Sequence, residues 1–425
     1  MTIALMFVIL FTLLVLGVPV AIALAGSSAL FILAGNVPPM VVAHRVINGV
    51  DSFPLLAVPF FILAGNLMNT AGITERIFNF ALALVGWMRG GLGHVNVGAS
   101  VIFAGMSGAA VADAGGLGSI EIKAMRDAGY DPGFSVGITA ASSTVGPIIP
   151  PSLPMVIYGV VSGASIGQLF AAGFIPGLVM ALSLMLMIFF FAGRYGFNRD
   201  QPFQWKLLAI TFKRAFLSLL TPVIIVGGIL SGAFTPTEAA VAACTYALFL
   251  GLFVYRTLSL KRFLRVSFDT IETTAVVLFV VAGAAIFAWV LTSNRVPEAA
   301  ATLLLGLSDR PWVILLMINF VLLVVGCFME TVAAITILVP VLLPIAVEIG
   351  IDPVHFGVIM VLNLMLGLLT PPVGMVLYVL SRVSGVPFER CVVATAPFLI
   401  PLVACLLLMT FVPGIAMWLP TLLYR

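Results

Sequence analysis

Charged residues are scarce in this chain: Asp, Glu, Lys and Arg make up 8% of its 425 residues, whereas 62% of the residues are hydrophobic. Soluble globular proteins carry about 25% charged residues. Apolar runs of about 20 residues, the length at which a helix spans a bilayer, recur from one end to the other. The scarcity of charge therefore excludes an ordinary soluble domain and predicts an all-α polytopic membrane protein.

Cysteine and histidine are also few. The four cysteines lie in apolar runs without CxxC spacing, and the three histidines lack the spacing of metal ligands. No GxxxxGK[ST] motif is present, so this chain is not expected to hydrolyse ATP. Paired aspartates on helices or a Ser–His pair, as an intramembrane enzyme would need, are missing too. These absences favour a transporter without a cofactor, and leave an intramembrane enzyme as a distant alternative.

Two apolar stretches are interrupted by proline and glycine. They are SSTVGPIIPPSLPMVIY at residues 142–158 and MLGLLTPPVGMVLY at residues 365–378. In hydrocarbon, the backbone groups freed by a broken helix must be satisfied by protein, water or an ion. When such a break recurs in corresponding places of two halves, it points to the binding site of a transporter.

The second half repeats the first at a constant offset of 221 residues around the breaks. Gly129, Asp131, Pro132, Ile138, Gly146, Pro150 and Pro151 match Gly350, Asp352, Pro353, Ile359, Gly367, Pro371 and Pro372. Each half reads as three spans, a short interfacial arm helix, a re-entrant helical hairpin, a broken helix and a final span. Five crossings per half is an odd number, so we predict two inverted repeats.

The positive charges predict the orientation. If residues 194–214 and 256–265 face the cytoplasm, fifteen of the nineteen Lys and Arg residues lie inside. Only Arg45, Arg295, Arg310 and Arg425 then lie outside. The positive-inside rule selects this orientation and places both chain ends outside.

The hairpin tips and the breaks define two candidate sodium sites. Backbone carbonyls freed at a break suit Na⁺, and half-helix N-termini suit an anionic group of a substrate. The first site comprises Ser107, Gly108, Ser142, Ser143, Thr144 and Gly146, and the second comprises Phe328, Glu330, Thr331, Met365, Gly367 and Thr370. Pro150, Pro151, Pro371, Pro372 and Ala109 are the candidate substrate-binding residues. No metal other than Na⁺ is expected.

Each of these residues also has a purely structural interpretation. The prolines could be kinks alone, and the small hydroxyl residues could be helix contacts. Asp113 is an acid in apolar surroundings, which is by default a functional hypothesis, but it could instead bond its own hairpin. Glu238, in TPTE, is typical of a helix N-terminus. Arg382 could attract a substrate carboxylate or anchor the cytoplasmic edge.

Four motifs, in this order, resemble the large membrane subunit of a TRAP (tripartite ATP-independent periplasmic) transporter. They are SGAAVAD (107–113), ASSTVGPIIPPSLPMVIYG (141–159), GAFTPTEAA (232–240) and GLLTPPVGMVLY (367–378). The resemblance covers essentially the whole chain. It implies a member of the ion-transporter superfamily in the bacterial inner membrane, driven by Na⁺, that carries a C4-dicarboxylate, a sialic acid or a sugar acid.

The resemblance also implies two partners and a mechanism. The partners are a small four-helix membrane subunit and a periplasmic substrate-binding protein, with membrane lipid around the complex and no nucleic acid. The mechanism is an elevator, in which a transport domain moves against a scaffold. The scaffold then covers residues 1–93 and 219–310, each with an arm helix, and residues 194–218 form an amphipathic cytoplasmic connector.

The implied transport domain covers residues 94–193 and 311–425, with hairpins at 94–126 and 311–349 and broken helices at 131–163 and 352–384. One departure matters. Many relatives have a second serine two residues after the first at the hairpin tip, where this chain has Ala109. A backbone ligand or water must then replace that hydroxyl. An autonomous sodium–organic anion symporter of the same superfamily remains the alternative.

Overall fold

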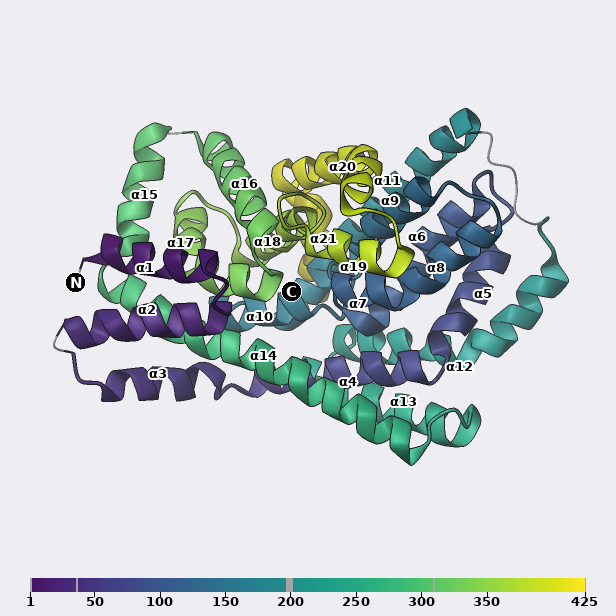
Figure 1. The fold of residues 1–425 in the computed structure, drawn as a ribbon, viewed down its shortest axis with the longest axis horizontal. Helices are drawn as coiled ribbons and strands as arrows, with labels where there is room; N and C mark the ends of the chain where they lie inside the picture. The colour runs from purple at the N-terminus through teal and green to yellow at the C-terminus, as the bar shows by residue number, and fades with distance from the viewer. Residues whose placement is uncertain (1, 36, 196–201, 309, 425) are drawn as a thin grey trace.

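The computed structural model describes residues 2–35, 37–195, 202–308 and 310–424; within these, the side chains of residues 105–107, 193–195, 304 and 305 are not described. All regular structure in the described ranges is helical, which confirms the all-α prediction (Figure 1). In this part of the chain, eight helices are long and apolar enough to cross a membrane. They are Phe53–Thr70, Ile166–Ala192, Trp205–Leu230, Pro236–Val254, Leu260–Ser293, Pro311–Phe328, Thr331–Glu348 and Phe388–Phe411.

The early helices of the two halves follow one another in the same order. The first half has α1 (Ile3–Val15), α2 (Val20–Ala34), α3 (Met40–Val50), η1 (Phe53–Leu56), α4 (Ala57–Thr70) and α5 (Ile73–Val85). The second half has α12 (Trp205–Leu230), α13 (Pro236–Phe249), η2 (Leu250–Val254), α14 (Leu260–Ser293) and α15 (Val296–Leu307). The short helices α5 and α15 lie at opposite ends of the long axis (Figure 1).

One difference between the halves is local. The 34-residue helix α14 is continuous, whereas its counterpart is divided into α3 and α4. Pro54 lacks the N–H that a continuing helix would need. Two residues before Pro54, the backbone of Ser52 is extended and not helical, with φ −140° and ψ 124°. The expected span of residues 53–72 therefore begins with a 3₁₀ turn.

The later helices are interrupted at both proline-rich stretches, between α9 and α10 and between α18 and α19. The first half continues with α6 (Gly91–Ser107), α7 (Ala110–Gly115), α8 (Leu117–Asp127), α9 (Pro132–Ser143), α10 (Leu153–Ser162) and α11 (Ile166–Tyr195). The second continues with α16 (Pro311–Phe328), α17 (Thr331–Glu348), α18 (Pro353–Gly367), α19 (Met375–Ser384), α20 (Phe388–Phe411) and α21 (Pro413–Leu423). The returning leg of the first hairpin is itself interrupted between α7 and α8, which the sequence did not lead us to expect.

Side-chain caps start several of these helices where the sequence predicts a start. The carboxylate of Asp131 accepts a hydrogen bond from the N–H of Phe134 (2.9 Å), and Asp352 accepts one from Val354 (2.7 Å). Thr235 and Glu238 form a reciprocal capping box at the start of α13, which confirms the structural interpretation of Glu238.

The two halves interlock through closely approaching helices. The broken-helix segment α9 of the first half packs on α20 of the second, and α18 of the second packs on α11 of the first. The contact between α9 and α20 depends on Gly137, where an added Cβ would lie 2.3 Å from the carbonyl oxygen of Ala394. Small residues at such contacts let helix backbones meet, which gains van der Waals contact inside a bilayer.

We therefore expect Gly137→Ala to lower stability. Forcing a methyl group into this contact costs about 1–3 kcal/mol, as other overpacked cores do. The apparent melting temperature of the purified protein in detergent should fall. Gly227→Ala in α12 is the matched control, because an added Cβ there meets nothing within 4 Å. Equal melting temperatures for the two variants would contradict this packing.

Candidate ion and substrate site

The tip of the first hairpin lies directly on the first helix break. The N–H of Leu153 donates a hydrogen bond to the carbonyl of Gly108 (3.3 Å). Gly108 has φ +61°, and a Cβ on it would lie 2.6 Å from the carbonyl oxygen of Pro151. The residue at this tip must therefore be glycine for two reasons, backbone conformation and close approach. Backbone groups of the tip and of the break are therefore in direct contact.

The second hairpin meets its break in a similar way. The N–H of Val373 donates to the carbonyl of Cys327 (3.2 Å). A Cβ on Gly367 would lie 2.4 Å from the carbonyl carbon of Gly326, so these two glycines allow backbone contact between α18 and α16. Thr370 Oγ1 lies 2.8 Å from Cys327 Sγ. Both predicted breaks are thus closed by a hairpin tip.

The predicted hydroxyl ligands of the first site are bonded mostly within their own helix. Ser143 donates to the carbonyl of Ala140 (2.8 Å), and Thr144 donates to that of Ala141 (2.7 Å). These hydroxyl oxygens keep lone pairs for a cation. The side chain of Ser107, also predicted here, lies outside the described part of the chain.

Ser142 belongs to a polar pair that has a counterpart in the second half. It donates to Oδ1 of Asn96 (2.5 Å) on α6, and Asn363 donates to Oδ1 of Asn319 (2.9 Å) on α16. Asn96 and Asn319 are 223 residues apart, and Ser142 and Asn363 are 221 apart. Sequence reasoning missed both asparagines at 96 and 319, whose spacing differs by two residues from the repeat offset of 221.

Asp113, on α7, has its carboxylate against the break of the first broken helix. It is 2% exposed, and neither of its oxygens has a hydrogen-bond partner in the described part of the protein. A Cβ on Gly146 would lie 3.2 Å from Asp113 Oδ2 and 3.4 Å from the carbonyl oxygen of Ser143. The carboxylate therefore does not bond its own hairpin within that part. It faces the predicted sodium site.

A second buried acid was not singled out from the sequence. Glu121, on α8, is 1% exposed, and its Oε1 has no partner among the described residues. The KAMRD run that follows Glu121 indicates an amphipathic helix, so the sequence gives no sign that this side chain faces inward. An unpaired buried carboxylate is costly unless it binds a proton or a cation.

At the second site, Glu330 caps the helix that follows the tip. Its carboxylate accepts hydrogen bonds from the N–H groups of Val332 (2.8 Å) and Ala333 (3.2 Å). Thr331 has a buried Oγ1 without a partner among the described residues. Met365 is 1% exposed, whereas the Phe328 side chain is 60% exposed, so Phe328 can contribute only its backbone here.

A cavity of about 390 Å³ lies beside the first hairpin tip. The predicted residues Ala109 and Pro151 line it on one side. On the other side it is lined by Asn66 and Asn69 of α4 and Thr273 of α14, which sequence reasoning missed. No charged side chain of the described residues lines it. Polar amides and backbone therefore meet whatever fills it.

The remaining predicted prolines lie elsewhere. Pro150 is buried, while Pro371 and Pro372 are exposed. The Pro150–Pro151 and Pro371–Pro372 peptide bonds are both cis. Among the candidate substrate-binding residues, only Ala109 and Pro151 line the cavity.

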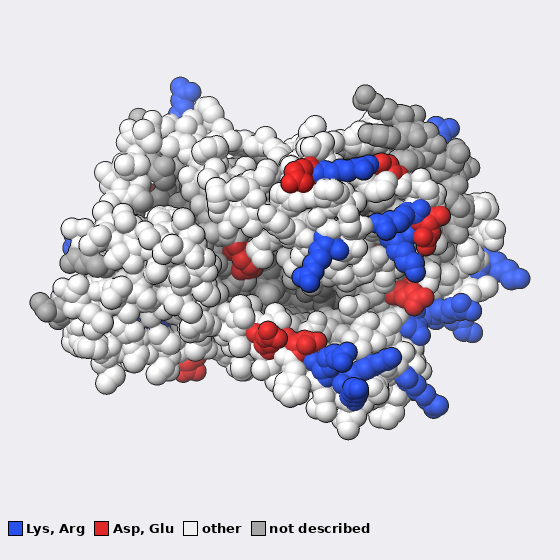
Figure 2. Space-filling model, in the orientation of Figure 1, with Lys and Arg blue, Asp and Glu red and all other residues white. Residues whose placement is uncertain are grey.

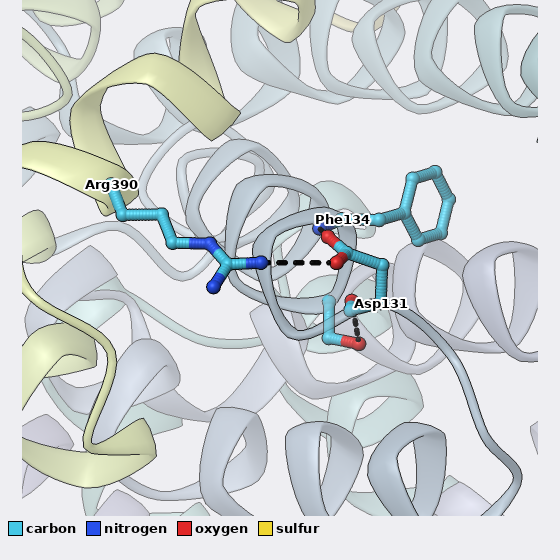
Figure 3. Close-up of polar contacts among 4 residues, drawn as sticks. Asp131, Phe134 and Arg390 are labelled. Atoms are coloured by element: carbon cyan, nitrogen blue, oxygen red, sulfur yellow. Dashed lines mark hydrogen bonds and ion pairs between the residues drawn. The ribbon is translucent and has the colours of Figure 1, made fainter.

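Two contacts join the later elements of the two halves. Asp131, at the start of α9, forms an ion pair with Arg390 of α20 (3.1 Å), and its other carboxylate oxygen accepts from the N–H of Phe134 (Figure 3). Arg126, at the end of α8, donates to the carbonyl of Ser384 (2.5 Å). An exposed ion pair contributes only about 0–1 kcal/mol, so the pair with Arg390 orients these elements more than it stabilises them.

The family model for the tripartite ATP-independent periplasmic transporter, DctM component, matches residues 7–415. The chain belongs to this family. It is 51% identical to the sialic acid TRAP transporter large permease protein SiaM of Vibrio cholerae, over 96% of this chain and 95% of that one. It is 41% identical to the C4-dicarboxylate TRAP transporter large permease protein DctM of Pseudomonas aeruginosa, over 89% and 88%.

A solved structure has the same fold. The Alcanivorax borkumensis YdaH transporter, described as having an unusual topology, superposes with a TM-score of 0.59 over 88% of each chain, at 16% identity. As a member of the DctM family, the chain is a multi-pass protein of the bacterial inner membrane and a transport component. Large permeases of this family work with a small membrane subunit and a periplasmic binding protein.

The contact between tip and break can be tested with two glycines of similar conformation. Gly108→Ala and Gly163→Ala both place alanine at positive φ, +61° and +74°, which costs about 1–2 kcal/mol in each. Only at Gly108 would the new methyl group also meet the break, because Gly163 has nothing within 4 Å. We expect Gly108→Ala to abolish substrate uptake by reconstituted protein and Gly163→Ala to retain it. Retained uptake in Gly108→Ala would contradict this arrangement.

Proposed function

We propose that this chain is the translocating subunit of a TRAP transporter that takes up a sialic acid together with Na⁺. Its partners would be a small four-helix membrane subunit and a periplasmic substrate-binding protein. The observation that carries the coupling to a cation is the buried carboxylate of Asp113 at the break beside Gly146, which has no hydrogen-bond partner among the described residues. The higher identity to the SiaM permease than to the C4-dicarboxylate permease supports the substrate.

Na⁺ supplies what the first site lacks. A buried carboxylate without a hydrogen-bond donor needs a positive charge or a proton to be stable. The carboxylate of Asp113 and the carbonyl oxygen of Ser143 both lie close to Gly146. Oxygen ligands suit a hard cation such as Na⁺. We therefore add Asp113 to the ligands predicted from the sequence.

The second site is supported by fewer observations. Thr331 offers a buried hydroxyl without a partner in the described part, and Glu330 brings a negative charge to the same tip. The capping bonds use one carboxylate oxygen of Glu330, Oε2. The two sites are therefore unequal: a free carboxylate faces the first, and a capping carboxylate with a hydroxyl faces the second.

The cavity beside Ala109 suits a polyhydroxylated acid. Asn69 accepts a hydrogen bond from Thr74 (3.2 Å) through its oxygen, which leaves its amide N–H groups to donate. Asn66 donates to Thr270 (3.1 Å), which leaves its oxygen to accept. Amides that both donate and accept can bind sugar hydroxyls. Since no cationic side chain in the described ranges lines the cavity, a substrate carboxylate would rely on backbone N–H groups near the tip.

The position of the cavity supports an elevator mechanism. It lies between α4 and α14 on one side and the first hairpin and break on the other. The contacts of Asp131 with Arg390 and of Arg126 with Ser384 join the hairpin and broken helix of the first half to α19 and α20 of the second. A body joined in this way can move as a unit past α4 and α14. Helix α9 packs on α20, and the corresponding helices of the other half, α18 and α11, pack on each other in the same way. This equivalence supports two inverted repeats.

The coupling can be measured in liposomes that contain the chain, its membrane partner and its binding protein. Uptake of radiolabelled sialic acid should require an inward Na⁺ gradient. Asp113→Asn should raise the Na⁺ concentration for half-maximal uptake by about tenfold or more, since about 1.4 kcal/mol of ligand energy corresponds to that factor. Asp127→Asn, an exposed acid at the end of α8, is the control and should match the unaltered protein.

Uptake that follows a proton gradient and ignores Na⁺ would overturn the choice of ion, though not the role of Asp113. Uptake without the binding protein and the small subunit would favour the autonomous symporter instead.

Removing the cavity amides should weaken substrate affinity and leave the Na⁺ requirement unchanged. Asn66→Ala and Asn69→Ala should each raise the substrate concentration for half-maximal uptake several-fold, because a lost hydrogen bond costs about 0.5–1.5 kcal/mol. The Na⁺ dependence should not change. Asn294→Ala, whose amide donates to the carbonyl of Val290 away from the cavity, is the control. Unchanged affinity in both cavity variants would exclude this cavity as the substrate site.

A further inference from the structure

A second polar hollow is lined by none of the residues of the candidate ion sites. It occupies about 300 Å³ between α5 and the beginning of α12. Its lining consists of two arginines, an amide, a hydroxyl and two leucines: Arg76, Arg214, Asn79, Thr211, Leu82 and Leu207. Each helix contributes hydrogen-bond donors and one leucine, so the lining is amphipathic. No acid lines this hollow among the described residues.

Arg76 is held in place before anything binds. Its guanidinium carbon lies 3.7 Å from the centre of the Tyr255 ring, and its Nη1 donates to the carbonyl of Gly72 (2.7 Å). The Tyr255 hydroxyl in turn lies 2.9 Å from Ser218 Oγ, on α12. A guanidinium fixed by stacking loses little freedom when its remaining N–H groups bind an anion.

Arg214 is free to share that anion. Its side chain is exposed, and it has no ion-pair partner in the described part of the chain. Glu75 lies only at the edge of an adjoining hollow that Arg76 and Arg214 also line. Two arginines and one nearby acid leave a net charge of +1, which matches a single phosphodiester better than a more highly charged group.

Aromatic side chains place this hollow at the boundary of the membrane. The ring of Trp87, just beyond α5, lies 5.9 Å from that of Phe203, measured between ring centroids. The Phe203 ring lies 4.9 Å from that of Trp205 at the start of α12. Trp205 is 76% exposed. Exposed tryptophans of this kind collect at the headgroup level of a bilayer. Figure 2 shows Lys and Arg gathered at the same end of the molecule, where Figure 1 places α5 and α12.

We propose that this hollow binds the headgroup of a glycerophospholipid with one phosphodiester. Arg76 and Arg214 would contact the phosphate, Asn79 would donate to its ester or headgroup oxygens, and the two leucines would contact the glycerol and the start of an acyl chain. A bound lipid would join the arm helix α5 to α12 from the membrane side. Basic hollows between membrane helices recognise headgroups through the same chemistry.

The proposal can be tested by native mass spectrometry of the purified full chain in detergent, titrated with phosphatidylglycerol. Arg76→Gln with Arg214→Gln should raise the lipid concentration for half occupancy of the tightest site by about fivefold for each arginine. Lys206→Gln with Lys213→Gln is the control: it also removes two positive charges, both from α12, but no residue that lines the hollow. This control should bind as the unaltered protein does.

Equal weakening in the two double variants would overturn the proposal, because it would show a general charge effect. Displacement of the lipid by inorganic phosphate in large excess would also overturn it, since the site would then recognise a free anion. If the double variant fails to fold, Arg214→Gln alone decides the matter, because that exposed side chain has no ion-pair partner in the described structure. A fivefold weakening in it would support the site, and no weakening would exclude it.

Discussion

The fold depends on how backbone groups are satisfied where a membrane helix is broken. In hydrocarbon an unpaired N–H or carbonyl costs several kcal/mol, so two interrupted helices in one membrane protein need partners for their open ends. Here each break meets a hairpin tip: Leu153 donates to Gly108, and Val373 donates to Cys327. The hairpins, the glycines that allow close approach and the interlocked halves all follow from this need. The groups left over at the breaks are the ones available to an ion.

Much of this arrangement could be predicted from residue types with a strict local meaning. Proline and glycine located the breaks, because their effect on the backbone does not depend on the rest of the fold. Asp131 and Asp352 located the helix starts, since a carboxylate before proline caps a helix wherever it lies. The inward orientation of Glu121 and the pairing of Asn96 with Ser142 could not be predicted. They depend on which helices become neighbours, and an apolar sequence hardly specifies this.

The cavity shows the same limit more clearly. Ala109 and Pro151 could be proposed because they lie at the tip and at the break, whereas Asn66 and Asn69 belong to a helix more than 35 residues earlier in the chain. Only the packing of α4 and α14 against the first hairpin brings them together. Site residues at a hairpin tip or a helix break can thus be recognised from their sequence motif. Site residues on the helices that pack against the tip and the break can be found only in the three-dimensional structure.

The acidic side chains differ in whether they are buried and whether they have a partner, and this difference determines which of them could bind a cation. The acids that lie deepest, Asp113 and Glu121, carry oxygens without partners in the described part of the molecule, whereas Asp131 pairs with Arg390 at the surface. A paired surface carboxylate gains little from a further cation, but an unpaired buried one gains a great deal, because it has given up its hydration. Binding of a cation near Asp113 would therefore act on the contact between the first tip and the first break. Since the cavity shares Gly108, Pro151 and Leu153 with that contact, ion and substrate would be bound by the same backbone and would stabilise the same arrangement.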